Sequence, residues 1–268
     1  MSATARQQRK GSAFRAMHGG EPFVIPNPWD AGSARILEAL GFQALATTSS
    51  GFAFTLGKLD GQVTLEEMAD HVAAIDAATD LPISADLENG YGPEPEAAAG
   101  AVRRIASAGA VGASIEDFDR DRRELYEIGH ATDRIRAAAE AARDTDVPFM
   151  LTARAENHIR GNPDLADTIG RLQAYDEAGA DVLYAPGLAT ADEVRAVCGS
   201  VSKPVNVLAV PTMSVGEIVD AGAQRISVGG ALTWVAIQAF ADAATAIRDG
   251  GDLSALAARV PVDDWFGG

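Results

Sequence analysis

The chain has 268 residues, 47% of them hydrophobic, and its 22 basic and 38 acidic side chains give a formal net charge of −16. This length and apolar content can bury a large core, whereas the acidic excess argues against nucleic acid and anionic membrane surfaces as partners. The single cysteine, Cys198, excludes an internal disulfide and a cysteine-rich zinc site. With no signal-peptide core and no apolar run near about 18 residues, we expect a soluble cytoplasmic protein.

Short apolar runs alternate with longer helical patterns along the chain. The expected strands cover residues 23–26, 44–48, 83–87, 113–116, 149–154, 182–185, 205–210 and 225–228. The expected helices cover residues 31–40, 65–78, 94–108, 132–143, 165–178, 192–201, 215–221 and 232–248. Strand–helix units that follow one another in this way are typical of a parallel sheet with crossover helices.

A weak internal repeat supports this phasing. The stretches EALGFQAL, SAGAVGAS, EAGADVLY and DAGAQRIS each place a glycine where a helix should end, at Gly41, Gly109, Gly179 and Gly222. Glycine adopts the left-handed conformation of a helix C-cap without steric cost. Eight units in about 250 residues favour an α/β fold, a (β/α)8 TIM barrel, over an open doubly wound sheet, whose glycine-rich nucleotide motif is missing. We expect residues 1–268 to form one barrel domain, with residues 1–20 as a flexible or helical N-terminal extension.

The last expected helix, LTWVAIQAFADAATAI, is apolar on nearly every side. Such a helix is normally covered from two sides, which one barrel cannot provide. We expect a second copy of the chain to cover it, because permanent interfaces resemble a core. The alternative is that the C-terminal DDWFGG, with Trp265 and Phe266, folds back over it.

Polar side chains gather at the carboxyl ends of the expected strands, where barrels of this kind carry their active sites. Asp86 and Glu88 end the third strand, Glu116 the fourth and Arg154 the fifth. Because alternate residues of a strand share a face, Asp86 and Glu88 should point together towards Glu116. Three such carboxylates repel one another without a cation, and all-oxygen ligation suits Mg²⁺ or Mn²⁺. We predict a metal site; the alternative is an ion-pair network in which Arg154 and solvent neutralise the acids.

Other polar residues give weaker signals. The SSG stretch offers hydroxyls and backbone N–H groups to a carboxylate, although a serine–glycine loop is ordinarily only a loop. His71 falls within a helix and is expected at the surface, and Cys198 is expected to be a small core residue. The residues that we assign to substrate binding are Ser49, Ser50, Gly51, His158 and Asn206.

Six stretches, found in order from about residue 20 to about residue 240, resemble the isocitrate lyase/phosphoenolpyruvate mutase superfamily. They are NPWDAGSARILEALGFQALATTSSG, ADLENGYG, GASIED, LTARAEN, KPVNV and RISVGG. The resemblance implies a (β/α)8 barrel whose eighth helix is exchanged between the subunits of a homodimer or homotetramer. It also implies chemistry next to a 2-oxo acid, through an enolate that Mg²⁺ stabilises.

The same resemblance assigns roles by position. Asp86 resembles the direct metal ligand, and Glu88 and Glu116 resemble the acids that hold metal-bound waters. Asp60, in GKLDG, resembles the acid of the loop after the second strand. Arg154 resembles the arginine that neutralises the developing enolate oxygen, where preorganised positive charge lowers the barrier most. The implied catalytic residues are Arg154, Glu116 and Asp60, and the implied carboxylate cradle is Ser49, Ser50 and Gly51.

Two departures from the family pattern bear on the activity. Glu88 stands where the acidic pattern has a second aspartate. The segment IEDFDRDRRELYEIGHATDRI lacks the Lys-Lys/Arg-Cys-Gly-His motif, whose cysteine is the acid of isocitrate and methylisocitrate lyases, and lacks the lysine of the phosphonomutase gating loop. Glu116, Tyr126 and His130 are left as proton donors, and the sequence does not decide among them.

We therefore expect a carbon–carbon lyase that depends on Mg²⁺, or on Mn²⁺, and cleaves a small 2-oxo or 2-hydroxy carboxylic acid. Cleavage of a phosphonate P–C bond, or mutase chemistry, is the alternative within the family. A non-catalytic barrel that binds a carboxylate metabolite is the alternative from a different class.

Overall fold

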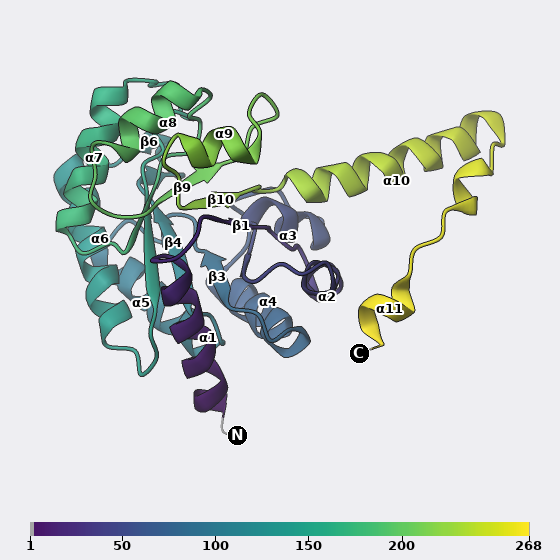
Figure 1. The fold of residues 1–268 in the computed structure, drawn as a ribbon, viewed down its shortest axis with the longest axis horizontal. Coiled ribbons are helices and arrows are strands. Elements are labelled where there is room, and N and C mark those ends of the chain that lie inside the picture. The colour runs from purple at the N-terminus through teal and green to yellow at the C-terminus, as the bar shows by residue number, and fades with distance from the viewer. Residues whose placement is uncertain (1–2, 268) are drawn as a thin grey trace.

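Eight short parallel strands form one sheet in the computed structural model, which describes residues 3–267 (Figure 1). The sheet order is β1-β10-β9-β8-β7-β4-β3-β2. The strands are β1 (Phe23–Ile25), β2 (Leu45–Ala46), β3 (Ile83–Asp86), β4 (Gly112–Glu116), β7 (Met150–Arg154), β8 (Val182–Tyr184), β9 (Val205–Leu208) and β10 (Arg225–Ser227). The two edges approach each other, since the Ala46 N–H donates to the Pro26 carbonyl at 3.0 Å. The predicted (β/α)8 architecture is thus confirmed as a nearly closed barrel.

Helices alternate with the strands and surround the sheet (Figure 1). They are α2 (Ala31–Ala39), α4 (Leu65–Ala78), α5 (Pro95–Ser107), α6 (Ile128–Arg143), α7 (Leu165–Glu177), α8 (Ala191–Cys198), α9 (Val215–Asp220) and α10 (Ala231–Gly250). Four of them, α2, α4, α8 and α9, begin with a reciprocal capping box, in which the N-cap side chain accepts a hydrogen bond from the N3 backbone. Their N-caps are Asp30, Thr64, Thr190 and Ser214. The predicted C-cap glycines all have left-handed backbones, with φ of 90°, 111°, 101° and 108° at Gly41, Gly109, Gly179 and Gly222.

An N-terminal helix, α1 (Ala3–Met17), covers the amino-terminal end of the barrel. Its Phe14 is fully buried, in an apolar cluster with Ile25, Ala44, Val111, Met150 and Val182. Lys10 reaches Asp76 on α4 at 2.6 Å. The extension is therefore helical over these residues and contributes to the core rather than trailing from it.

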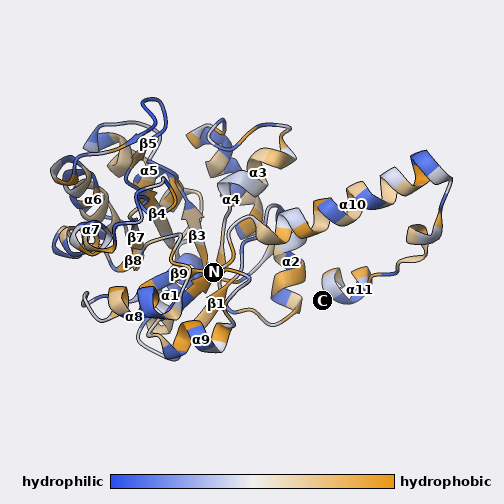
Figure 2. Cartoon of the chain, turned by 90° about the horizontal axis from the view of Figure 1, so that it is seen from above, coloured by the Kyte–Doolittle hydropathy of each residue, from blue (hydrophilic) through white to orange (hydrophobic). Residues whose placement is uncertain are grey.

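Helix α10 extends away from the barrel, and Figure 2 shows stretches of hydrophobic residues along it in orange. Within the described residues, Thr233 is its single buried side chain, and Val235 and Phe240 are 68% and 72% exposed. The chain then returns through η1 (Ser254–Ala257) to α11 (Val262–Phe266), which packs on α2. Because Arg35 of α2 donates to the Phe266 carbonyl at 2.9 Å, the tail covers α2, and the fold-back alternative for α10 was wrong.

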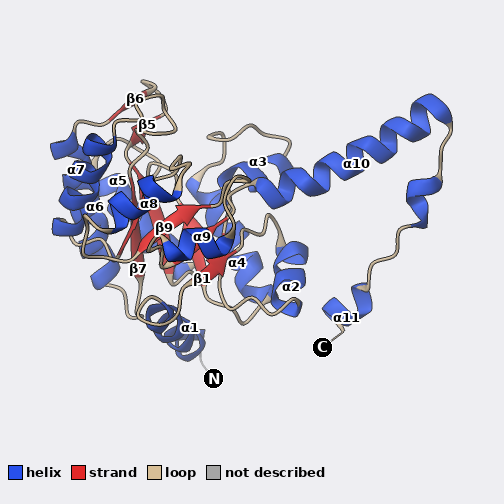
Figure 3. Ribbon diagram, turned by 45° about the horizontal axis from the view of Figure 1, so that its top comes forward, coloured by secondary structure: helices blue, strands red, loops and turns tan. Residues whose placement is uncertain are grey.

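Two further elements lay outside the sequence-based assignment. SSG is the first turn of a short helix, α3 (Ser49–Thr55), rather than a loop. A hairpin of β5 (Phe118–Asp119) and β6 (Glu124–Leu125) follows the fourth barrel strand and stands above the sheet in Figure 3. The surface position expected for His71 was also wrong, because its ring is buried and stacks on Phe52 of α3, with ring centroids 3.8 Å apart. No helix within residues 3–267 is long and apolar enough to cross a membrane.

Candidate active site

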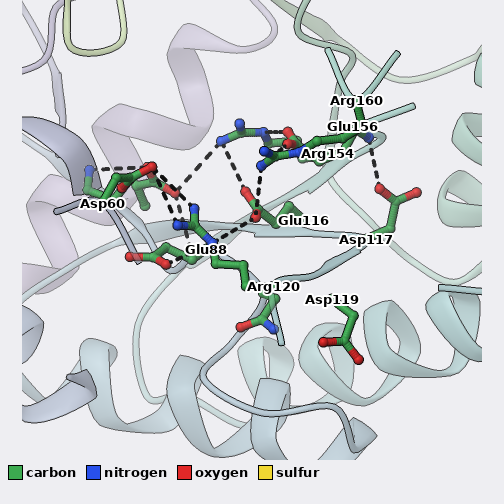
Figure 4. A network of polar contacts seen from close by, with 12 residues as sticks. Asp60, Glu88, Glu116, Asp117, Asp119, Arg120, Arg154, Glu156 and Arg160 are labelled. Atoms are coloured by element: carbon green, nitrogen blue, oxygen red, sulfur yellow. Dashed lines mark hydrogen bonds and ion pairs between the residues drawn. The ribbon is translucent and has the colours of Figure 1, made fainter. Parts of the chain in front are cut away.

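Charged side chains from several segments meet above the carboxyl ends of the strands (Figure 4). Asp86 is the last residue of β3, Glu116 the last of β4 and Arg154 the last of β7. β4 and β7 pair so that Glu116 and Arg154 are register partners, which directs both side chains to the same face of the sheet. The structure thus brings together three of the residues that the sequence singled out.

Glu88 reaches this cluster through a turn rather than through strand alternation. The strand ends at Asp86, and Glu88 has φ of +51° in the segment that follows. A non-glycine residue seldom occupies this left-handed region, and such residues gather at functional sites. The Glu88 N–H donates to Asp86 Oδ1 at 3.2 Å. The alternation of side chains along a strand, from which we expected Asp86 and Glu88 to share a face, therefore does not apply here. The two acids are nevertheless in contact.

Arg154 lies among three carboxylates at the centre of the cluster. Its Nη1 lies 3.5 Å from Glu116 Oε2 and 4.0 Å from Asp86 Oδ1, and its Nε donates to Glu156 Oε1. On the other side of Glu156, Arg160 Nη2 lies 2.7 Å from Oε2. Glu116 and Glu156 are almost completely buried, so these ion pairs are little screened by solvent.

The β5–β6 hairpin is held over the cluster by two arginines. The Arg160 guanidinium stacks on Phe118 of β5, 3.9 Å from the ring centroid, a cation–π contact that anchors the hairpin. Arg120, at the hairpin turn, points back towards the acids (Figure 4). The sequence analysis assigned none of the arginines of this segment to the site.

Arg120 contacts three acids at once. Its Nε lies 3.1 Å from Glu88 Oε2 and 3.4 Å from Glu116 Oε1, and its Nη1 lies 3.4 Å from Asp60 Oδ2. Asp60 thus joins the cluster through Arg120. Gly61 makes room for this guanidinium, because a Cβ at that position would lie 2.5 Å from Arg120 Nη1.

The ion pairs of this cluster leave an excess of negative charge. Three guanidinium groups, of Arg120, Arg154 and Arg160, face five carboxylates, of Asp60, Asp86, Glu88, Glu116 and Glu156. Burial raises the pKa of Glu88 to about 7. Burial and the neighbouring Glu156 raise the pKa of Glu116 to about 8. Two carboxyls can therefore retain protons near neutrality, which offsets the two excess charges in the absence of a cation.

The donor atoms of the cluster suit a hard divalent cation. Glu88 Oε1 and both carboxylate oxygens of Glu116 are buried and have no hydrogen-bond partner among the described residues. Buried oxygens without donors are costly, and a cation with oxygen ligands would satisfy them. No three Asp, Glu, His or Cys side chains between residues 3 and 267 are arranged as a ready-made metal-binding group, since Arg120 and Arg154 lie between the acids. The set Asp86, Glu88 and Glu116 therefore stays a prediction.

Asp117 fixes the strand end beside the cluster. Its Oδ2 accepts from Tyr175 Oη at 2.5 Å and from Arg171 Nη1 at 3.0 Å. Its Oδ1 accepts from the Glu156 N–H at 2.8 Å. Asp117 is buried and its side-chain partners, Arg171 and Tyr175, come from α7. This network therefore sets the position of Glu156 and takes no part in the open site.

A cavity of about 60 Å³ lies inside the barrel below the cluster. Asp86 and Arg154 line its upper part, and Asn206 and Arg225 also line it. Asn206 hydrogen-bonds with Arg225 and Ser227. The predicted substrate residue Asn206 therefore faces the barrel interior.

The other predicted substrate residues lie elsewhere around the site. The Ser49 N–H donates to Asp86 Oδ2 at 3.3 Å. Ser50 and Gly51 adjoin the start of α10, since a Cβ on Gly51 would lie 2.5 Å from Thr233 Oγ1. His158 turns towards α7, where its Nδ1 lies 2.9 Å from Thr168 Oγ1. None of these four residues lines the cavity inside the barrel.

Of the three proton donors considered, Glu116 alone lies within the cluster. Tyr126 Oη accepts from Asn89 Nδ2 at 3.4 Å, and the exposed His130 contacts the Pro93 carbonyl at 2.8 Å. Cys198 is partly buried at the end of α8, and burial raises the pKa of its thiol to about 11. A thiol with so high a pKa is a poor nucleophile at neutral pH, in agreement with a packing role.

Comparison with known proteins places this site in a family. A family model described as phosphoenolpyruvate phosphomutase matches residues 14–248. An uncharacterized protein of Mycobacterium tuberculosis is 33% identical over 237 residues, 88% of each chain. An oxaloacetate decarboxylase of Rhodopseudomonas palustris is 29% identical and covers 94% of this chain and 89% of its own.

A solved structure from Burkholderia cenocepacia J2315, provisionally described as a lyase/mutase, is 48% identical, with a TM-score of 0.95 and 98% of both chains covered. These matches extend over the barrel and over all the segments that carry the acid cluster. The chain therefore belongs to the phosphoenolpyruvate phosphomutase family, within the isocitrate lyase/phosphoenolpyruvate mutase superfamily of carbon–carbon lyases and mutases.

Proposed function

We propose that the protein is a lyase that depends on Mg²⁺, or on Mn²⁺, and cleaves a carbon–carbon bond in a small 2-oxo or 2-hydroxy carboxylic acid. The observation that carries this proposal is the excess of carboxylates in the cluster, together with the three buried carboxylate oxygens of Glu88 and Glu116 that have no hydrogen-bond partner among the described residues. A structural ion-pair network has no need of such oxygens, whereas a cation site does.

Asp86, Glu88 and Glu116 would hold the cation. When bound, Mg²⁺ supplies Lewis acidity next to the carbonyl or hydroxyl oxygen of the substrate. Arg154 holds a second positive charge at the same place, fixed by Glu116 and Glu156. Because this guanidinium is partly buried and already oriented by its carboxylate partners, it stabilises an enolate oxygen as charge develops there, with little reorganisation.

Glu116 and Glu88 can each hold a proton while no cation is bound. Their pKa values of about 8 and about 7 lie close to neutral pH, where a carboxyl group both releases and accepts a proton readily. Arg120 covers Glu88 and Glu116 from the hairpin, so water reaches these acids less easily.

Substrate choice is tested by a panel of compounds with Mg²⁺: oxaloacetate, substituted malates and phosphonopyruvate, with pyruvate formation followed. Spontaneous decay of oxaloacetate in the presence of Mg²⁺ is subtracted with an enzyme-free sample. We expect activity on at least one carbon–carbon substrate and its loss in Asp86→Ala. Turnover of phosphonopyruvate alone would favour the P–C alternative. No turnover on the whole panel, with binding of the compounds unchanged in Asp86→Ala, would leave a carboxylate-binding barrel.

We also propose that the protein works as a homodimer or a homotetramer in which α10 packs on a second copy of the chain. The exposed apolar residues of α10 support this, as does the apolar depression at its base, lined by Trp29, Ser33, Ile36, Leu37, Leu40, Leu232, Val235 and Ala236. An apolar surface of this kind is unusual on a monomer and typical of a permanent interface.

A further inference from the structure

Arg225 is a buried cation without a carboxylate partner. It is the first residue of β10, is 4% exposed and lines the cavity inside the barrel. No carboxylate among the described residues forms an ion pair with it. A buried charge is normally paired, because the cost of removing it from water is several kcal/mol.

The groups around Arg225 are all neutral. Its Nε donates to Asn206 Oδ1 at 2.8 Å and its Nη2 to Thr152 Oγ1 at 2.9 Å. Its Nη1 lies 3.2 Å from His18 Nε2. The other ring nitrogen of His18, Nδ1, contacts the Phe14 carbonyl at 2.8 Å and must carry the proton there, which leaves Nε2 as an acceptor and the imidazole uncharged.

These three contacts use only part of the guanidinium. A guanidinium has five N–H donors, and Asn206, Thr152 and His18 account for three of them. The one carboxylate that lines the cavity, Asp86, is instead held by the N–H groups of Ser49 and Glu88. Arg225 therefore lines the cavity with a full positive charge and with two N–H donors that these three contacts leave unused.

We propose that this cavity is a binding site for a small monoanionic group, held by the free donors of Arg225. The group is a carboxylate or an inorganic anion of similar size, since a cavity of about 60 Å³ holds only a few heavy atoms. It comes either from one end of a carboxylic acid substrate or from a free anion that occupies the barrel. The site lies below the acid cluster and requires neither a metal nor turnover.

Formate is a suitable probe, with the full-length protein in EDTA. Sodium formate replaces sodium gluconate at constant ionic strength, and the midpoint of thermal unfolding is recorded; gluconate is too large for the cavity. We expect a saturable rise of the midpoint with formate in the wild type, because a ligand that binds only the folded state stabilises it.

Two substitutions should remove this response. Arg225→Gln removes the charge, and Asn206→Asp places a carboxylate 2.8 Å from Arg225 Nε. Ser227 Oγ, which accepts from Asn206 Nδ2 in the wild type, can turn its hydroxyl to donate to the new carboxylate. In both variants we expect the apparent Kd for formate to rise at least about tenfold. Asn206→Asp forms an internal ion pair and should fold even if Arg225→Gln does not. Gln173→Glu, on the exposed face of α7, makes the same change in net charge and should keep the wild-type response.

A second arm identifies the source of the anion. With Mg²⁺ present, oxalate is titrated with and without saturating formate. If the apparent oxalate Kd rises in proportion to formate, the site takes a carboxylate of the substrate; if it does not change, the site takes a free anion. A wild type without a saturable formate response would overturn the proposal, as would equal responses in the wild type and Asn206→Asp. Since the first arm uses no metal or substrate, an inactive enzyme has no bearing on it.

Discussion

Arg120 Nε lies 3.1 Å from Glu88 Oε2, so a guanidinium from the hairpin after the fourth strand neutralises an acid that follows the third. Both groups are largely screened from water, with the Glu88 side chain 5% exposed and the Arg120 side chain 23% exposed. The same arginine contacts Glu116 and Asp60. The positively charged Arg120 therefore lies next to the acids to which we assign the metal. A metal ion bound there and the Arg120 guanidinium would repel each other.

Replacing Arg120 should strengthen metal binding. In Arg120→Gln the cluster keeps its five carboxylates with one guanidinium fewer. We expect the apparent Kd for Mn²⁺ to fall about fivefold or more, since like charges a few ångströms apart repel by at least about 1 kcal/mol. Isothermal titration calorimetry measures this directly.

The matched control is Arg122→Gln, in the same hairpin. The Arg122 side chain is 76% exposed and lies 3.8 Å from Asp119, away from the cluster, so its replacement should leave the Mn²⁺ affinity within about twofold of wild type. Equal affinities in Arg120→Gln and in the wild type would show that Arg120 does not oppose the cation.

The sequence was informative where periodicity or local chemistry decides the structure. The barrel strands and the C-cap glycines followed from patterns that depend on near neighbours, and Asp86, Glu116 and Arg154 followed from their places at strand ends. Arg120 could not be placed in this way, because its contact with Glu88 depends on how a hairpin folds over a neighbouring strand. Arg225 was missed because it opens a strand, at the end opposite to the one where chemistry was sought.

Metal binding should depend on pH through Glu88 and Glu116. Their pKa values are raised to about 7 and about 8, and the metal requires the deprotonated carboxylates. The apparent association constant for Mg²⁺ should therefore rise as pH increases and level off above about pH 8. Calorimetry in two buffers with different ionisation enthalpies should show up to about two protons released at pH 6.5 and almost none at pH 9. An affinity that is constant from pH 6 to pH 9 would contradict the assigned ligands.

His71 should make the fold less stable in mild acid. Burial lowers its pKa from 6.5 to about 4, so the unfolded chain binds a proton more tightly than the folded one. The resulting loss of stability is absent above about pH 6.5, grows as pH falls below it and is complete below about pH 4. For one such histidine the loss between pH 7.5 and pH 5 is about 2 kcal/mol.

His71→Phe isolates this contribution. The ring still stacks on Phe52, and His71 Nε2 has no hydrogen-bond partner to lose. Urea unfolding gives the free energy of unfolding at pH 7.5 and at pH 5. The drop between these two pH values should be about 2 kcal/mol smaller in the variant than in the wild type. The same pH dependence in both proteins would mean that His71 titrates normally.

Phe240 should be essential for oligomer formation. It is 72% exposed in the single chain and lies on the part of α10 that projects from the barrel (Figure 1). If a second subunit covers it, Phe240→Arg buries an unpaired charge in an apolar interface, which costs several kcal/mol. The variant should therefore shift towards monomer in sedimentation velocity experiments. Asp242→Arg, two residues along the same helix, is the control: it changes net charge in the same direction at an exposed position that is already polar, so the oligomer should persist. A wild type that sediments as a monomer at micromolar concentration would mean that α10 has another partner.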